Sequence, residues 1–313
     1  MPTTPSGSAI VWAPSVPGHP SEPCATEAPA QPPRKVTVDA NERSVTAYVA
    51  NLNTARATEL CIRSMRHFAG HPFELVVGDC GSTDGSLKLL ERFADKGWLR
   101  LEVAPNGRRH PEWLSSWLAE CPSRYALFSD SDVEYRSPGW LADMVATATA
   151  TGAALVCGRM QQETECFVHP VTKAERRLAA RPTAWLLMLD TAQVRGRVDG
   201  NFDYHEVENF DAFGGKVAYD TAAWYFHQLR EAGLPWAEMP RSWQHSYRHF
   251  GGLTWLGPLR SGPAWRTRAK QMAKLVIVQA HLRRAQREGW GNTVATASEP
   301  GLARPAAAEQ TTG

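Results

Sequence analysis

The chain has 313 residues, of which 43% are apolar and 21% are charged, a composition that predicts a globular core and excludes a fibrous or wholly disordered protein. It has no run of about 18 apolar residues and no CxxC pair among its six cysteines, so we expect no transmembrane helix, disulfide scaffold or zinc ribbon. The net charge of +2 conceals a basic stretch over residues 241–290, with ten Lys or Arg and one acid, which indicates an anionic ligand or surface near the end of the chain.

Two terminal segments, residues 1–42 and 291–313, are rich in Pro, Ala, Ser and Thr and lack a periodic apolar pattern, so we expect disordered tails there. Residues 1–33 contain no Lys or Arg and no apolar block of signal-peptide length, which predicts a cytoplasmic protein without a secretory signal. The folded part is then a single domain over residues 43–264, followed by a basic helix over residues 265–290.

Strand patterns alternate with helix patterns between residues 45 and 157. Short β-rich runs are separated by segments whose apolar residues recur at helical spacing. The predicted strands are 45–50, 73–78, 99–103, 125–129 and 153–157, and the predicted helices are 54–68, 86–93, 111–121 and 140–149. This alternation predicts an α/β fold with a mostly parallel sheet and helices on both faces. Ligands bind such sheets at the carboxyl ends of the strands.

The sequence Ser129-Asp130-Ser131-Asp132 directly follows the apolar strand at residues 125–129. Two carboxylates one residue apart repel each other, so they are poorly placed for stability. They do suit a hard divalent cation such as Mg²⁺ or Mn²⁺, which prefers oxygen ligands. A solvated turn, in which Asp and Ser are common, is the alternative interpretation.

A second polar loop, Asp79-Cys80-Gly81-Ser82-Thr83-Asp84-Gly85, follows the strand at residues 73–78. Its glycines allow the backbone to approach a ligand closely. An Asp at the end of a buried strand can accept hydrogen bonds from a base or a ribose. The alternative is an ordinary loop whose Asp84 caps the next helix, so Asp79 is the better candidate for ligand binding.

Together these motifs resemble the family 2 glycosyltransferases of the GT-A fold, a Rossmann-like α/β fold. Members typically show a strand ending in an Asn-containing loop, then a strand ending in Asp-x-Gly-Ser-x-Asp-Gly, then an apolar strand ending in Asp-x-Asp. This chain has Asn51-Leu52-Asn53 and the two loops described above, in that order. The resemblance covers residues 45–250 and implies a nucleotide-binding half over residues 43–135 and an acceptor half with a lid over residues 136–264.

The resemblance also implies roles for individual residues. The nucleotide-diphosphate sugar would be bound by Asn51, Asn53, Asp79, Ser82, Asp130 and Ser131. Within that set, Asp79 would contact the nucleobase, and Asp130 would lie near the ribose and the metal. Asp132 would be the direct ligand of a Mn²⁺ or Mg²⁺ ion. Cys80 stands where the family more often has Asp or Asn, and this departure leaves the nucleobase and the sugar open.

Sugar transfer from such a donor needs one group that deprotonates the acceptor hydroxyl and another that stabilises the departing diphosphate. The base in the family is a carboxylate at the start of a helix, after a Gly-containing loop. The best match is Asp220, which precedes a helical stretch over residues 221–230. Asp203, Glu206 and Glu208 lie just upstream and are the alternatives, and a plain helix cap is the other interpretation of Asp220.

Two histidines, His245 and His249, follow the proposed base. A helix would place them on one face, because they are four residues apart. Many GT-A enzymes complete the metal site with a histidine, and we favour His245 because the flexible Gly251-Gly252 segment begins after His249. A structural role is the alternative for either side chain.

Residues 250–263 mix glycines with apolar anchors. This composition predicts either a lid that closes over the nucleotide and excludes water or a surface loop. Trp243 and Trp255 lie near enough in sequence to stack on a sugar ring, although most Trp side chains belong to a core.

The basic helix at residues 265–289 carries apolar residues partly on one stripe: Met272, Leu275, Val276, Val278 and Leu282. One interpretation is peripheral contact with an anionic membrane, at its inner face, as would suit a lipid-linked acceptor. The other is a terminal helix that packs on the domain with a basic outer face.

The sequence therefore predicts a metal-dependent glycosyltransferase that uses a nucleotide-diphosphate sugar, and the family implies inversion at the anomeric carbon. The acceptor is open among a small metabolite, a lipid, a glycan and a peptide. No nucleic-acid partner is expected, because no recognition module is visible. The rivals are a catalytically inactive sugar-nucleotide-binding protein and, ranked lower, a sugar nucleotidyltransferase, whose Gly-rich loop residues 51–56 lack.

Overall fold

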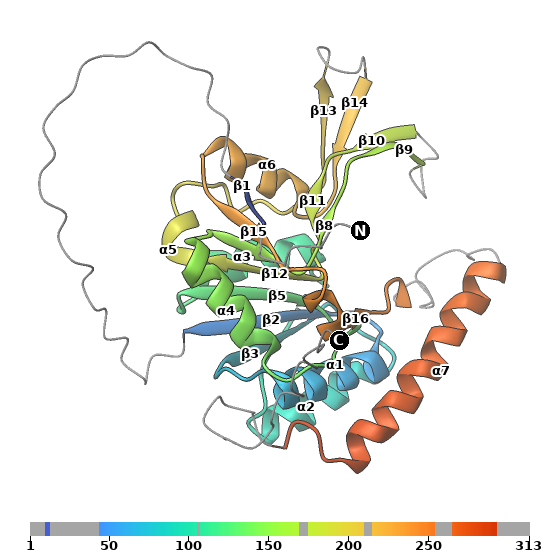
Figure 1. The fold of residues 1–313 in the computed structure, drawn as a ribbon. Coiled ribbons are helices and arrows are strands. Elements are labelled where there is room, and N and C mark those ends of the chain that lie inside the picture. Colours follow the sequence, from blue (N-terminus) through green and yellow to red (C-terminus); the bar gives the residue numbers. More distant parts are fainter. Residues whose placement is uncertain are drawn as a thin grey trace, which may run out of the picture.

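The computed structural model describes residues 10–12, 44–104, 107–168, 175–209, 215–253 and 265–292. An eight-stranded sheet forms its centre, and helices cover both faces of this sheet (Figure 1). A smaller four-stranded sheet projects from one end of the molecule (Figure 1). The strand order in the central sheet is β1-β15-β7-β12-β5-β2-β3-β4.

The central sheet is parallel on one side and mixed on the other. Strands β5, β2, β3 and β4 are neighbours in that order and run parallel, whereas β12 runs antiparallel between β5 and β7. In chain order the strands are β1 Ile10–Trp12, β2 Val45–Asn51, β3 Glu74–Asp79, β4 Arg100–Val103, β5 Tyr125–Asp130, β7 Leu155–Cys157, β12 Leu186–Asp190 and β15 Trp236–Glu238. The predicted α/β fold with a mostly parallel sheet is confirmed.

The helices predicted between residues 54 and 149 are present, with ends within two residues of the expected ones. The helices are α1 Ala55–Phe68, α2 Ser86–Asp95, α3 His110–Glu120, α4 Trp140–Thr151, α5 Thr191–Val194, α6 Ala223–Glu231 and α7 Trp265–Arg287, with a short 3₁₀ helix η1 at Trp243–Ser246. The hydrophobic periodicity of the sequence was therefore a reliable guide to this part of the chain.

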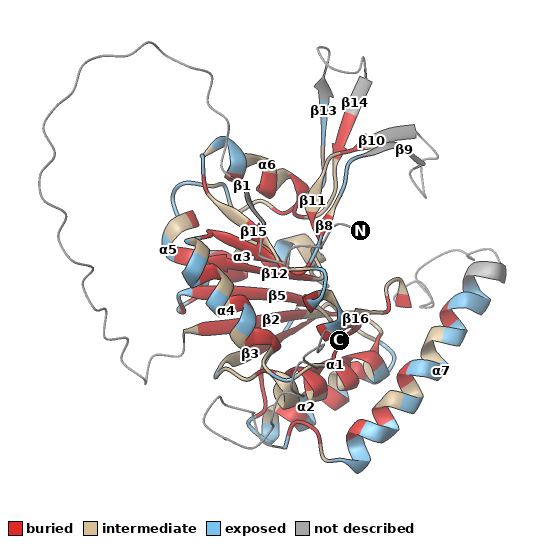
Figure 2. Ribbon diagram, viewed as in Figure 1, coloured by how far each residue is buried: buried red, intermediate tan, exposed pale blue. Residues whose placement is uncertain are grey.

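Side chains that alternate along β2 separate two hydrophobic cores. Val45, Ala47 and Val49 pack in one core with residues of α1, α2 and α4. Tyr48 points to the other face and packs with residues of α3 and α6. Strands β2, β3, β5, β7 and β12 are accordingly buried almost along their whole length, whereas the edge strand β4 is not (Figure 2). This two-sided burial holds the carboxyl ends of the parallel strands at one rigid edge.

Four further strands form the smaller sheet, in the order β13-β14-β10-β9. They are β9 Thr164–Val168, β10 Glu175–Leu178, β13 His205–Asn209 and β14 Gly215–Tyr219. Two short ladders complete the described strands: β8 Met160–Gln161 with β11 Arg181–Pro182, and β6 Val133–Tyr135 with β16 Tyr247–His249. The sequence analysis predicted none of these strands.

The structure differs from one expectation about the domain and adds a central strand that was not predicted. Residues 1–42 were expected to be a disordered tail throughout, but Ile10–Trp12 forms β1 and pairs antiparallel with β15 at the edge of the central sheet. Strand β12 was not predicted, although it lies in the middle of that sheet. Most of the predicted lid, including Trp255, lies outside the described residues.

Helix α7 packs along α1 through a third hydrophobic cluster. Ala57 and Leu60 of α1 meet Val278, Leu282 and Ala285 of α7 in this cluster. The interpretation of α7 as a helix that packs on the domain is therefore correct for this face. Within the described part of the chain, no helix combines the length and apolar character needed to cross a membrane.

Candidate metal and nucleotide site

Three parallel strands end in polar residues at the same edge of the central sheet. Asn51 at the end of β2 is in register with Asp79 at the end of β3, and Ala50 is in register with Asp130 at the end of β5. Because the three strands are parallel neighbours, their carboxyl ends meet at one edge, where α/β sheets bind ligands. The two polar loops singled out in the sequence therefore belong to one site.

Asp130, Asp132 and His249 form a carboxylate–histidine cluster at this edge. One ligand atom from each side chain lies within 4.8 Å of the others. The imidazole Nε2 of His249 is 3.1 Å from Oδ1 of Asp132 and 3.5 Å from Oδ2 of Asp130. Asp132 is only 7% exposed, so its side chain is buried and does not belong to a solvated turn.

Pairing of β16 with β6, a strand more than 100 residues earlier in the chain, brings His249 to the carboxylates. His249 is in register with Val133, the residue after Asp132, and the backbone N–H of Phe250 donates to the carbonyl oxygen of Asp132 at 3.0 Å. The ring of Trp185 stacks on the imidazole, with centroids 4.4 Å apart. The backbone pairing and the ring contact together fix the position of His249.

The structure favours His249 over His245 as the third member of the cluster. The helical spacing assumed for the two histidines is absent, because His245 lies in η1 and His249 lies in the extended strand β16. The side chain of His245 is exposed, and it does not belong to the carboxylate–histidine cluster. The expectation that His245 is the metal ligand therefore has no support in this geometry.

The charges of the cluster shift the titration of its members. Burial by itself lowers the pKa of His249, but hydrogen bonds to Asp130 and Asp132 outweigh burial and raise the pKa to about 9. Burial raises the pKa of Asp130, but the hydrogen bond from His249 and the charges of His110 and Arg181 bring it below its ordinary value. At neutral pH the cluster therefore holds ionised Asp130 beside a protonated imidazole.

This donor set fits a divalent metal ion. Carboxylate oxygens suit Mg²⁺ and Mn²⁺, and an imidazole nitrogen is a common ligand of divalent transition-metal ions. A metal ion bound by His249 must displace the proton that the imidazole carries in the metal-free protein. Asp130, Asp132 and His249 are the residues that would hold the ion.

The loop after β3 is organised around the carboxylate of Asp79. Its Oδ1 accepts hydrogen bonds from the backbone N–H groups of Gly81 (3.0 Å) and Ser82 (2.8 Å), and its Oδ2 accepts one from Nδ2 of Asn51 (2.8 Å). Asp79 is 1% exposed. The geometry thus points to a role in shaping the loop, whereas we expected Asp79 to contact the nucleobase.

The other predicted nucleotide-site residues join the same loop network. Oγ of Ser82 accepts hydrogen bonds from Nδ2 of Asn51 and from the backbone N–H of Asn53, both at 3.0 Å. Asn53 has a positive φ of 54°, a conformation that Asn tolerates better than most residues, and its Oδ1 accepts a hydrogen bond from the N–H of Thr83 at 2.7 Å. Ser131 shares a hydrogen bond with the hydroxyl of Thr54 at 2.9 Å and so links this loop network to the cluster.

Asp220, the predicted base, lies between β14 and α6. Helix α6 starts three residues later, and the Oδ1 of Asp220 accepts a hydrogen bond from the N–H of Thr221 at 2.8 Å. Its Oδ2 pairs with Nη2 of Arg181 at 2.9 Å, and its side chain is 41% exposed. Because the charge of Arg181 also lowers the pKa of Asp130, this arginine connects Asp220 electrostatically to the cluster.

The upstream alternatives to Asp220 have different surroundings. Asp203 accepts two hydrogen bonds from the guanidinium of Arg109, at 3.0 and 2.7 Å. Glu206 accepts a hydrogen bond from the hydroxyl of Tyr204 at 2.7 Å. The side chain of Glu208 lies outside the described part of the structure. Among the described candidate bases, Asp220 is thus the one that pairs with Arg181, the arginine whose charge lowers the pKa of Asp130.

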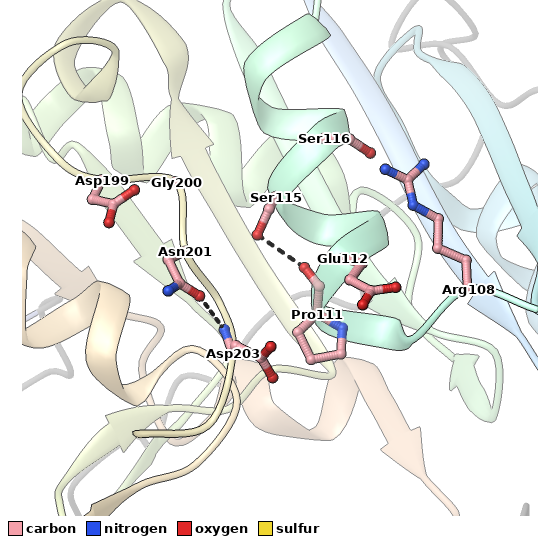
Figure 3. Close-up of a pocket in the computed structure, with 9 residues that line it drawn as sticks. All are labelled: Arg108, Pro111, Glu112, Ser115, Ser116, Asp199, Gly200, Asn201 and Asp203. Atoms are coloured by element: carbon pink, nitrogen blue, oxygen red, sulfur yellow. Dashed lines mark hydrogen bonds between the residues drawn. The ribbon is translucent and has the colours of Figure 1, made fainter. Parts of the chain in front are cut away.

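A pocket of about 530 Å³ lies beside α3 (Figure 3). It lies between the first turns of α3 and residues 199–203, and it shares the N-terminus of α3 with the cluster, since Nε2 of His110 is 3.6 Å from Oδ1 of Asp130. The pocket is lined by Arg108, Pro111, Glu112, Ser115, Ser116, Asp199, Gly200, Asn201 and Asp203. The polar groups of its lining include the carboxylates of Glu112, Asp199 and Asp203 and the hydroxyls of Ser115 and Ser116.

Sequence reasoning missed two residues at this site, Trp185 and Arg181. Trp243, which we considered for sugar stacking, belongs instead to a hydrophobic core. Neither missed residue belongs to a recognisable motif, and the one local signal is the apolar run after Trp185, which is consistent with a buried strand. That run does form β12, which begins beside the cluster, where Leu186 pairs with Ser129.

The fold and the site together define an α/β protein with a carboxylate–histidine site at the carboxyl edge of its parallel strands. The sequence model of glycosyl transferase family 2 matches residues 46–226, more than half of the chain. The chain belongs to this family, and the suspected resemblance is confirmed. No curated protein matches the sequence.

Solved structures with a similar chain trace include those of two proteins that bind nucleotide sugars. The mannosyltransferase PcManGT from Pyrobaculum calidifontis, in complex with GDP-Man and Mn²⁺, is 19% identical over 67% of this chain and 59% of its own, with a TM-score of 0.44. S. aureus TarS 1-349 in complex with UDP-GlcNAc is 17% identical over 63% of this chain and 58% of its own, with a TM-score of 0.36. The chain thus matches about three fifths of the length of each.

Proposed function

We propose that this protein is a metal-dependent glycosyltransferase that moves a sugar from a nucleotide-diphosphate donor to an acceptor hydroxyl with inversion. The observation that carries the proposal is the cluster of Asp130, Asp132 and His249 at the strand ends of a family 2 chain. A buried cluster of acidic residues costs stability unless a cation compensates it, so a ligand-binding role explains its presence.

The proposed metal is Mn²⁺ or Mg²⁺, held by Asp130, Asp132 and His249. When bound, such an ion acts as a Lewis acid and stabilises the negative charge of the departing diphosphate. The loop network formed by Asn51, Asn53, Asp79 and Ser82 would hold the nucleotide beside it. In that network Asp79 shapes the loop, and the ligand meets the loop surface rather than the Asp79 carboxylate.

Asp220 is the proposed general base. An oxygen of the acceptor hydroxyl forms a bond to the anomeric carbon while the bond from that carbon to the diphosphate oxygen breaks, and Asp220 takes the hydroxyl proton. Arg181 orients the Asp220 carboxylate through the 2.9 Å ion pair. Nη1 of Arg181 also donates a hydrogen bond to the carbonyl oxygen of Thr221 at 2.9 Å, and this bond anchors the guanidinium to the same turn.

The test measures the thermal stability of the full chain with UDP, GDP, dTDP or CDP, with and without Mn²⁺. A nucleotide at about one hundred times its dissociation constant stabilises a protein by about 2.7 kcal/mol, a measurable shift in melting temperature. We expect one nucleotide to stabilise the protein in the presence of Mn²⁺ and to lose its effect in chelator.

His249→Ala and His245→Ala are a matched pair for this test. We expect His249→Ala to abolish the metal-dependent shift and His245→Ala to retain it, because only His249 contacts Asp130 and Asp132. No shift with any of the four nucleotides in Mn²⁺ would overturn the proposal. A shift without sugar transfer to any acceptor or to water would instead indicate an inactive sugar-nucleotide-binding protein.

A further inference from the structure

Helix α7 carries two apolar stripes on opposite faces. One stripe, with Val278, Leu282 and Ala285, is buried against α1. The second, which we call the outer stripe, repeats at the spacing of a single helix face and is exposed at every position. The outer stripe consists of Ala269, Met272, Ala273, Val276, Ile277 and Ala280. The single stripe expected from the sequence is thus divided between two faces.

The exposed apolar area in the outer stripe is substantial. Met272 is 52% exposed, Val276 is 69% exposed and Ile277 is 41% exposed. These three are half of the large apolar side chains that are exposed in the described part of the chain. Figure 2 shows buried and exposed positions interleaved along α7, with α1 covering one side only. An apolar stripe of this kind on a solvent-facing helix needs a partner.

The charge around the outer stripe is of one sign. Residues 265–287 contain seven Lys or Arg and no Asp or Glu. Arg268 and Lys270 are exposed at one end of the stripe, and Arg283, Arg284 and Arg287 are exposed just beyond its other end, where Arg284 pairs with Glu288 at 2.8 Å. A second copy of this helix would bring two such sets of positive charge together, so charge complementarity disfavours self-association and favours an anionic surface.

We propose that α7 docks the protein on an anionic lipid bilayer, with the outer stripe in the interface and the basic residues on the lipid headgroups. A basic helix with one apolar face is the usual form of such a contact. Each Lys or Arg near an anionic bilayer strengthens binding by about fivefold. This inference concerns binding alone and does not rest on the proposed transferase activity.

Docking would bring the bilayer close to the candidate site. Nζ of Lys274 donates a hydrogen bond to the carbonyl oxygen of Gly251 at 2.6 Å, two residues after His249. His281 bonds to the buried carboxylate of Glu134 at 2.7 Å, two residues after Asp132. The outer stripe lies on the opposite side of the helix from its packed face, so about one helix diameter, 10 Å, separates the bilayer from these contacts.

The test is co-sedimentation of the full chain with vesicles of phosphatidylcholine alone and of phosphatidylcholine with phosphatidylglycerol. We expect binding to the anionic vesicles only, weakened by salt. The variant Val276→Glu with Ile277→Glu should bind at least about tenfold more weakly, because two charged side chains replace the apolar contact. The variant Arg283→Gln with Arg287→Gln should bind about 25-fold more weakly, from two lost charges.

Thr149→Glu is the matched control, because it adds a negative charge at an exposed position of α4. It should bind vesicles nearly as well as the unmodified chain, and circular dichroism should show all variants folded. Absence of binding to anionic vesicles at low salt would overturn the proposal. The proposal would also fail if the variant Val276→Glu with Ile277→Glu sedimented with anionic vesicles as well as the unmodified chain. It would fail too if the protein formed a dimer in solution that this variant alone disrupts, because the outer stripe would then bind a second copy.

Discussion

Two groups of polar residues share one edge of the central sheet, and they differ in how the protein neutralises them. In the loop network, Asp79 is 1% exposed and three protein donors hydrogen-bond to its carboxylate. In the cluster, Asp130 and Asp132 share the imidazole of His249, and the imidazole of His110 lies 3.6 Å from Asp130. Protein hydrogen bonds hold the loop network together, whereas the paired carboxylates of the cluster offer ligands to a cation. From this comparison we infer a scaffolding role for the first group and a chemical role for the second.

The largest effect is expected for Asp220→Asn, because this change removes the proposed base at nearly constant shape. General base catalysis contributes about 100- to 10,000-fold, so we expect a loss of that size in kcat. Donor binding, measured as the Mn²⁺-dependent shift in melting temperature, should be unchanged. Steady-state assays with the donor identified by the nucleotide screen provide the measurement.

The upstream carboxylates supply the controls for Asp220→Asn. Asp203→Asn and Glu206→Gln should each change kcat by less than about tenfold, because these two carboxylates accept hydrogen bonds from Arg109 and Tyr204. A larger loss in either of them than in Asp220→Asn would move the base to that residue. It would also separate the chemistry from Arg181, whose charge lowers the pKa of Asp130.

A loss of folding stability is expected for Asp79→Asn. This loss would distinguish the scaffolding role of the loop network from the chemical role of the cluster. The amide loses the charge that strengthens three hydrogen bonds, and its NH₂ group faces the donating Nδ2 of Asn51. We expect a loss of about 2 to 3 kcal/mol in the free energy of unfolding, equivalent to about 5 to 10 °C in melting temperature. Chemical denaturation measures it.

Asp84→Asn is the matched control for Asp79→Asn. Asp84 is exposed and accepts hydrogen bonds from the N–H groups of Ala55 and Ser86, so its replacement should cost about 1 kcal/mol or less. If Asp79→Asn retained full stability and lost nucleotide binding, Asp79 would contact the ligand as the family resemblance first implied, and the assignment of the loop network to scaffolding would fail.

The two arginines that pair with the candidate bases Asp220 and Asp203 give a third test. Arg181→Gln removes the 2.9 Å partner of Asp220, so we expect kcat to fall about 10- to 100-fold through misplacement of that carboxylate, with little change in the KM for the donor. Arg109→Gln is the equivalent change at the Arg109–Asp203 ion pair and should have a small effect. The reverse order of effects would indicate Asp203 as the base.

Local sequence patterns predicted the strands and helices whose positions depend on hydrophobic periodicity. The strands and helices between residues 45 and 157 follow the hydrophobic periodicity, and the polar strand ends followed from the parallel arrangement. Strand β12 escaped prediction, because an apolar run does not reveal which strands it will join or in which direction. Pairing between distant segments sets both properties.

The two histidines show the same limit at the scale of single residues. A spacing of four residues places side chains together on a helix, but β16 is a strand, and there the position of His249 follows from its register with β6. Arg181 and Trp185 reach the site through β11 and the segment before β12, so no motif in their vicinity marks them. The residues predicted best are those whose neighbours in space are also near in sequence.

The smallest effect is expected for Trp185→Leu, which tests whether the cluster is held in place by its surroundings. The stacked ring orients the imidazole of His249, and Trp185 meets Asp130 only through the backbone, where the N–H of Asp130 donates to the carbonyl oxygen of Trp185 at 3.2 Å, a bond that Trp185→Leu retains; Trp185 is therefore a positioning residue. An aromatic pair contributes about 0.5 to 1.5 kcal/mol, which corresponds to about threefold to tenfold weaker Mn²⁺ binding. At saturating Mn²⁺ the kcat should return to nearly the unmodified value, because metal excess restores the occupied site. A loss of kcat that persists at saturating metal would contradict the positioning role and would indicate that Trp185 contacts the sugar or the acceptor.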